Sequence, residues 1–167
     1  RLTPSEVDTF LTIIKNSAVG SLRQQKMLQN TKYRDFAILT LLLRTGIRVS
    51  ECVSLDISDL NFNENSMCVV RKGRKEHILY FDNVTKEALN DYIEIERPHM
   101  IESDSEKALF MSLRNKRMAV RSIQEMVDNY AKVAVSNKKI SPHKMRSTYG
   151  TALYNKTGDI RLVADVL

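Results

Sequence analysis

The chain has 167 residues, of which 28% are charged and 43% hydrophobic, and its formal net charge is +6. This length predicts one domain, able to bury roughly two thirds of the surface of its unfolded form without a disulfide or metal. Cys52 and Cys68 form no CxxC motif, so we expect reduced thiols and no zinc site. The sequence has no signal-peptide pattern and no apolar run of the ~20 residues that span a bilayer, so we expect a soluble, cytoplasmic protein without membrane association.

The first predicted element is a helix that begins at Thr3-Pro4-Ser5-Glu6. Threonine is the expected N-cap, proline suits the first helical position, and the glutamate completes a capping box. Its apolar stripe consists of Val7, Phe10, Leu11, Ile13 and Ile14.

A buried helix follows, because only Thr40 interrupts the apolar run from Phe36 to Leu43. Gly46 is expected to end this helix in the left-handed conformation. Arg48 and Glu51 come next, three residues apart, on the predicted first turn of a new short helix. This placement would hold a charge rigidly beside the core, although an exposed ion pair worth a few tenths of a kcal/mol explains the same spacing.

A basic hairpin is predicted after residues 55–65, whose Asp, Asn and Ser content favours turns. The β-prone runs 67–70 and 78–81 flank Arg71-Lys72-Gly73-Arg74-Lys75, a tip with four cations and one glycine. Neither strand alternates cleanly between polar and apolar residues, so the sequence assigns no buried face.

The second half of the chain is predicted to be mainly helical. Asp82 or Asn83 caps a helix that runs through Ile95 and ends at Pro98, and residues 120–133 have helical apolar spacing. The short apolar run 108–111 is either an extra strand or buried chain. Ser141-Pro142 opens a further helix with His143 and Arg146 on one face of its first turn.

Clustered positive charge favours a nucleic-acid partner over simple solubility. The clusters are Arg71, Lys72, Arg74 and Lys75; Arg114, Lys116 and Arg117; and Lys138, Lys139, Lys144 and Arg146. If Arg48, Lys72, His143 and Arg146 converge at a helix N-terminus, they form a phosphate socket that needs no metal. Taken singly, each of these residues is better explained as a solvated surface group.

Three strings in the order TGIRVSE, VVRKGRKE and SPHKMRSTYG resemble the catalytic domain of the tyrosine recombinases, the phage-type integrase and Xer family. The resemblance covers nearly all of residues 1–167 as one domain. It implies a mainly helical α+β fold with a small antiparallel sheet. It also implies site-specific DNA recombination or integration, as in mobile genetic elements, through a 3′-phosphotyrosine.

The resemblance also implies roles for individual residues. Arg48 and Arg146 would grip the scissile phosphate, and His143 would assist as a proton donor or acceptor. Lys72 would protonate the departing 5′-oxygen, and Glu51 would hold the arginine and histidine in position. Further DNA contacts are expected from Arg71, Arg74, Lys75 and Lys144.

The expected partners are double-stranded DNA and other recombinase subunits, assembled as a tetramer, with no cofactor and no metal. The family's nucleophilic tyrosine is expected beyond Leu167, and its N-terminal DNA-binding domain before residue 1, so the chain would be a piece of a longer protein. Tyr149 and Tyr154 share the helix of Arg146 and are better explained as core residues. Two alternatives stay open, namely a type IB topoisomerase-like relaxing enzyme and a DNA-binding module without catalysis.

Overall fold

The apolar run around Leu39 forms the central helix of the protein in a computed structural model, which describes residues 4–7, 11–12 and 30–134. This helix, α3 (Lys32–Arg44), has no exposed surface from Ala37 to Leu42, as the sequence predicts for a helix packed on all sides. Gly46 follows with φ 72°, so the predicted left-handed helix end is confirmed. The expected first helix is described only at residues 4–7 and 11–12, which are helical.

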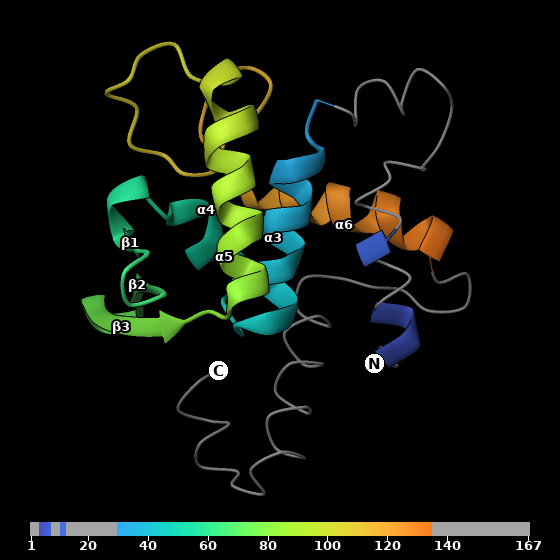
Figure 1. The fold of residues 1–167 in the computed structure, drawn as a ribbon, viewed down its shortest axis with the longest axis horizontal. Helices are drawn as coiled ribbons and strands as arrows, with labels where there is room; N and C mark the ends of the chain where they lie inside the picture. Colours follow the sequence, from blue (N-terminus) through green and yellow to red (C-terminus); the bar gives the residue numbers. More distant parts are fainter. Residues whose placement is uncertain (1–3, 8–10, 13–29, 135–167) are drawn as a thin grey trace, which may run out of the picture.

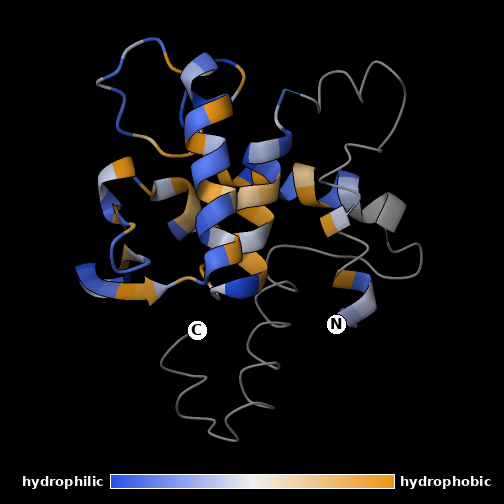
Figure 2. Ribbon diagram, in the orientation of Figure 1, coloured by the Kyte–Doolittle hydropathy of each residue, from blue (hydrophilic) through white to orange (hydrophobic). Residues whose placement is uncertain are grey.

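Helix α5 lies alongside α3 and shields one of its sides (Figure 1). It spans Asn83–Asp91, and the Asp82 carboxylate caps it by accepting the Thr85 amide at 3.0 Å, as expected. The helix continues as a π-helical segment, Tyr92–Glu96, and a 3-10 turn, Arg97–His99, where Pro98 brings it to its end. Figure 2 shows hydrophobic and hydrophilic bands alternating along α5, as expected of a helix with one buried face.

The N-terminus of α3 is held by the carboxylate of Glu96, the last residue of the π-helical segment Tyr92–Glu96. Glu96 accepts the amides of Tyr33 at 3.0 Å and Arg34 at 2.8 Å, two donors that have no partner within the helix. Burial raises the pKa of the Glu96 carboxyl, while these two amides oppose the shift. The polar contact therefore fixes how α3 and the end of α5 meet.

Helix α6 (Val120–Ala134) crosses behind α3 (Figure 1). The two helices share a buried polar contact, because the Tyr130 hydroxyl donates to Asp35 at 2.9 Å. Asp35 has no exposed surface and also accepts bonds from Thr31 and the Arg34 guanidinium. Three side-chain donors offset the cost of burying the Asp35 charge, so this contact helps to specify how α6 packs against α3.

The sheet is three-stranded and antiparallel, in the order β1 (Leu60–Asn61), β2 (Ser66–Arg71), β3 (Lys75–Tyr80). The hairpin of β2 and β3 was predicted, whereas β1 lies in the segment expected to form turns only. Met67 pairs with Leu79 on the buried face of the sheet. The other face exposes Val70, Ile78 and Tyr80, which explains why polarity did not alternate along these strands.

The expected fold class is thereby confirmed as mainly helical with a small antiparallel sheet. The run 108–111 is buried chain joined to its neighbours by isolated bridges, Asp56 with Ala108 and Met111 with Arg117. Cys52 is buried and Cys68 half-buried, and neither forms a disulfide. Within the described ranges, no helix is long and apolar enough to cross a bilayer.

Candidate active site

Arg48 is fixed at the point where the core helix turns into α4 (Val49–Ser54). It is the N-cap residue of α4, with extended backbone angles of φ −79° and ψ 149°. Its neighbour Ile47 is completely buried, while Arg48 itself is half-buried. The backbone of Arg48 is thus anchored on the core, as the sequence predicted, and its side chain begins at the edge of the buried region.

Glu51 connects this helix start to the hairpin. Its Oε1 accepts the backbone amide of Arg48 at 3.0 Å, so the glutamate reaches back to the N-cap as in half of a capping box. Its Oε2 accepts the Arg71 Nε at 2.9 Å, in an ion pair whose side chains are 8% (Arg71) and 4% (Glu51) exposed. One carboxylate therefore joins two of the three sequence strings predicted to carry chemistry, TGIRVSE and VVRKGRKE.

Lys72 lies at the exposed tip of the hairpin, in the turn Lys72–Arg74 between β2 and β3. The turn is possible because Gly73 adopts φ 80° and Arg74 adopts φ 59°. Lys72, Arg74 and Lys75 are all exposed. Arg71, which the sequence grouped with them as a DNA contact, instead points inward toward Glu51, so the predicted cationic cluster divides into one inward and three outward side chains.

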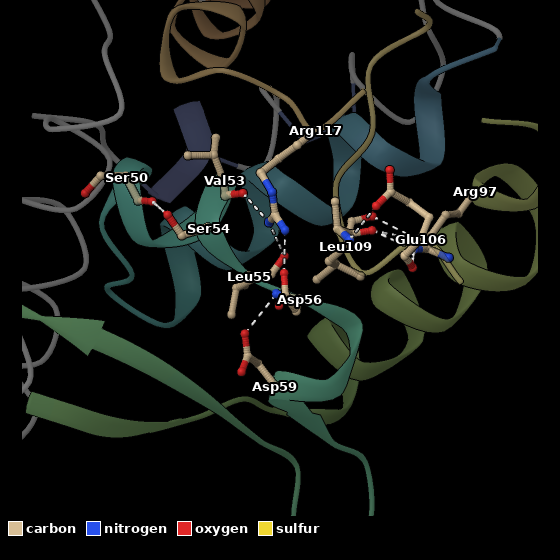
Figure 3. Close-up of polar contacts among 11 residues, drawn as sticks. Ser50, Val53, Ser54, Leu55, Asp56, Asp59, Arg97, Glu106, Leu109 and Arg117 are labelled. Atoms are coloured by element: carbon tan, nitrogen blue, oxygen red, sulfur yellow. Dashed lines mark hydrogen bonds and ion pairs between the residues drawn. The ribbon is translucent and has the colours of Figure 1, made fainter. Parts of the chain in front are cut away.

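The C-terminal end of α4 is held by Arg117, whose role the sequence analysis missed. Its Nη1 donates to the carbonyl oxygens of Val53 and Leu55, both at 2.9 Å, and its Nη2 pairs with the Asp56 carboxylate (Figure 3). Asp59 in turn accepts the Asp56 amide at 2.8 Å. Arg117 was counted only as one member of a basic cluster, because nothing in a single sequence shows which cation faces a helix end.

A buried arginine, Arg97, supports the segment that packs against the end of α4. Arg97 donates to the carbonyl oxygens of Glu106 at 2.9 Å, Ala108 at 2.6 Å and Leu109 at 3.2 Å (Figure 3). The Leu109 amide then donates to the Leu55 carbonyl at 3.0 Å. The backbone that follows α4 is therefore held by two guanidinium groups, each of which gives several directed bonds.

The structure thus brings together Arg48, Glu51 and Arg71, the strand residue that directly precedes Lys72. A guanidinium and an ammonium group presented from neighbouring elements suit the binding of a phosphate. The other predicted site residues, His143, Lys144 and Arg146, lie outside the described residues, as do Tyr149 and Tyr154. The convergence of Arg146 and His143 on Arg48 stays a prediction.

Comparison with known proteins gives concordant matches. The model of the phage integrase family matches residues 1–167. Tyrosine recombinase XerC of Caldanaerobacter subterraneus is 37% identical over 169 residues, covering 97% of this chain and 47% of that protein. Tyrosine recombinase XerD of Staphylococcus epidermidis is 32% identical over 152 residues, covering 91% and 52%. The chain therefore spans about half the length of the curated relatives it matches.

Solved structures show the same fold. The crystal structure of XerA recombinase superposes with a TM-score of 0.81 at 26% identity, covering 99% of this chain and 54% of that one. The pre-cleavage complex of XerH site-specific recombinase with its difH substrate has the same TM-score at 20% identity, covering 100% and 46%. At that lower identity the likeness concerns the fold alone.

Proposed function

Because the chain belongs to the phage integrase family, we propose that the protein carries out site-specific DNA recombination by cutting and rejoining strands through a 3′-phosphotyrosine. The sequence relatives are themselves tyrosine recombinases. The single observation that carries the proposal is the position of Arg48, held at the α4 N-cap by Glu51. An arginine whose backbone is fixed in this way can present its guanidinium to charge that develops on a phosphate.

In the proposed site, Arg48 and Arg146 bind the non-bridging oxygens of the scissile phosphate, and His143 exchanges a proton beside them. The support for Arg146 and His143 is their spacing in the P-H-x-x-R motif at the start of a predicted helix. Glu51 positions Arg48 through its amide. These roles need no cofactor and no metal ion, since side-chain cations supply the positive charge.

Lys72 is the proposed acid that protonates the departing 5′-oxygen. Its exposed place at the hairpin tip lets it reach a bound duplex, and Arg74 and Lys75 beside it are proposed as phosphate contacts. Lys144 is a further proposed DNA contact. The XerH structure holds that enzyme on its difH substrate, which supports double-stranded DNA as the partner here.

The whole protein is proposed to act as a tetramer on DNA in the cytoplasm, with its nucleophilic tyrosine outside residues 1–167. The relatives are about twice as long as this chain, which leaves room for such a segment. An in-line attack on phosphorus needs the nucleophile opposite the leaving group, within ~3–3.5 Å. Tyr149 is expected on the same predicted helix as Arg146, so it would approach the phosphate from the side of the gripping arginine.

The full-length protein incubated with a nicked suicide duplex tests this function. We expect a covalent protein–DNA adduct at a tyrosine outside residues 1–167, located by mass spectrometry, that still forms in EDTA. An adduct on Tyr149 or Tyr154 would show that the nucleophile is misplaced. Binding without any adduct would favour the DNA-binding module, and relaxation of plasmids without a specific site would favour the topoisomerase-like alternative.

A further inference from the structure

Arg71 differs from the other cations of the hairpin in where its side chain lies. It is the last residue of β2 and pairs across the sheet with Lys75. Alternation along the strand places it on the same face as the buried Met67 and Val69. Its side chain is only 8% exposed, whereas the next residue, Lys72, is exposed.

The carboxylate that receives Arg71 also holds the start of α4. Glu51 uses one oxygen for the Arg48 amide at 3.0 Å and the other for the Arg71 Nε at 2.9 Å. Both side chains of the ion pair are buried, so water screens the contact little and its geometry is well defined. Arg71 and Lys72 are consecutive residues, so a single peptide bond joins the anchored arginine to the exposed lysine.

The contact with Glu51 restrains the Arg71 side chain. Swinging this side chain out toward a phosphate would break a buried ion pair and leave the Glu51 charge uncompensated, which is strongly unfavourable. Anchored to Glu51 through its Nε and only 8% exposed, Arg71 is better placed to restrain its neighbours in the chain than to contact DNA.

We propose that Arg71 is a positioning residue that fixes Lys72 relative to Arg48 through the shared carboxylate of Glu51. The inference rests on the proposed function. In that reaction the tyrosine oxygen, whose proton passes to His143, bonds to phosphorus as the P–O5′ bond breaks, and the Lys72 ammonium gives its proton to the 5′-oxygen. Arg71 contributes by holding the backbone of Lys72 at a position from which its side chain reaches the phosphate that Arg48 binds.

The test uses the full-length protein with two cleavable duplexes, which differ only in carrying oxygen or sulfur at the 5′-bridging position. A thiol ionises near pH ~8.5, so a sulfur leaving group departs without a proton from Lys72. We expect Arg71→Gln to slow single-turnover cleavage of the oxygen substrate by ~10²-fold, as misplacing a reacting group by about 1 Å does. Cleavage of the sulfur substrate should stay near the wild-type rate, and the Lys72→Ala variant should show the same pattern.

Two further variants keep the result interpretable. Arg71→Lys retains a positive partner for Glu51, so it should fold and fall between wild type and Arg71→Gln on the oxygen substrate. Arg44→Gln removes another arginine–carboxylate pair, Arg44 with Asp82 at 2.8 Å, outside the proposed site and should cleave both substrates normally. Amide hydrogen exchange at residues 72–75 should accelerate in Arg71→Gln alone.

Several results would overturn the inference. Equal slowing on both substrates would mean that Arg71 does not act through Lys72, and a loss confined to DNA affinity would make it a phosphate contact after all. Unchanged exchange at the hairpin tip would show that the ion pair does not fix it. A wild-type protein that cuts neither substrate would overturn the proposed function as well, whereas normal wild-type cleavage with an unaffected Arg71→Gln would remove only this inference.

Discussion

Arg117 and Asp56 form an ion pair that joins the end of α4 to the chain leading into α6. The same guanidinium donates to the last carbonyls around α4, at Val53 and Leu55, so one side chain satisfies acceptors that a helix end leaves open. Helix α4 is therefore held at both ends. Glu51 bonds the amide of its N-cap residue, Arg48, and Arg117 bonds the carbonyl groups at its C-terminal end.

Replacing Arg117 with methionine should destabilise the domain by about 1–3 kcal/mol, because hydrogen bonds from a charged donor are lost together. The free energy of unfolding in urea measures this change. Arg114→Met, at an exposed position of the same loop, is the matched control and should change stability by less than about 0.5 kcal/mol. Equal effects of the two substitutions would contradict the anchoring role.

Arg48→Ala should reduce DNA cleavage by the full-length protein by ~10²–10³-fold, as removal of one preorganised charge contact does. Affinity for the duplex should change little, since many other contacts hold the backbone. Arg48→Lys should recover only part of the rate, because an ammonium lacks the forked geometry of a guanidinium. Single-turnover cleavage and gel-shift titration give the two quantities, and a parallel loss of both would argue for a binding role alone.

Arg74→Ala and Lys75→Ala should each weaken binding to duplex DNA at low salt. If each side chain neutralises one phosphate, the slope of log K against log salt should become shallower by about 0.9 for each variant. Lys107→Ala is the control, because Lys107 is an exposed cation outside the hairpin, with its backbone carbonyl bonded to the Ile57 amide. An affinity independent of salt would mean that the partner is not a nucleic acid.

Stability should fall at alkaline pH in a way that depends on Tyr130. Burial and the adjacent Asp35 carboxylate raise the pKa of the Tyr130 hydroxyl above its ordinary value. In the unfolded chain a tyrosine ionises near pH ~10, so above that pH the unfolded state binds fewer protons and unfolding becomes easier. Each such group lowers the free energy of unfolding by about 1.4 kcal/mol per pH unit until its folded pKa is reached.

Tyr130→Phe should remove the contribution of one titrating group from this alkaline fall in the free energy of unfolding. It should also lower the free energy of unfolding near neutral pH by ~1–3 kcal/mol, because the bond to Asp35 is lost. Urea unfolding at several pH values from 8 upward, measured in buffers of equal ionic strength, gives both quantities. Tyr80→Phe, at an exposed tyrosine of β3, should leave the decline as in the wild type. An identical pH dependence in all three proteins would refute the assignment.

The sequence predicted the features that depend on local signals. The apolar run to Leu43, the left-handed Gly46 and the Asp82 cap each obey rules that act over a few residues, and the structure agrees with all three. Strand β1 was missed because it has only two residues, Leu60–Asn61, and its pairing with β2 depends on the fold.

Within the candidate site, the sequence predicted that Arg48 and Glu51 lie close together, but it did not predict their contacts. The spacing of Arg48 and Glu51 placed them on one helical turn, which the structure confirms. The pairing of Glu51 with Arg71 joins residues twenty positions apart, and no local rule selects Arg71 over the three cations that follow it. The roles of Arg97 and Arg117 could not be predicted for the same reason. The carbonyl groups that these arginines bind are brought to them only when the backbone has folded.

The backbone at the hairpin tip also bears on how this protein can change by mutation. Two consecutive residues, Gly73 and Arg74, have positive φ, and only the first is a glycine. An L-residue with a side chain is disfavoured there by about 1 kcal/mol, so Arg74→Gly relieves local strain. A search for thermostable variants would therefore favour glycine at this position. If Arg74 binds a phosphate as proposed, selection for DNA affinity would retain arginine, and the two pressures would oppose each other at a single codon.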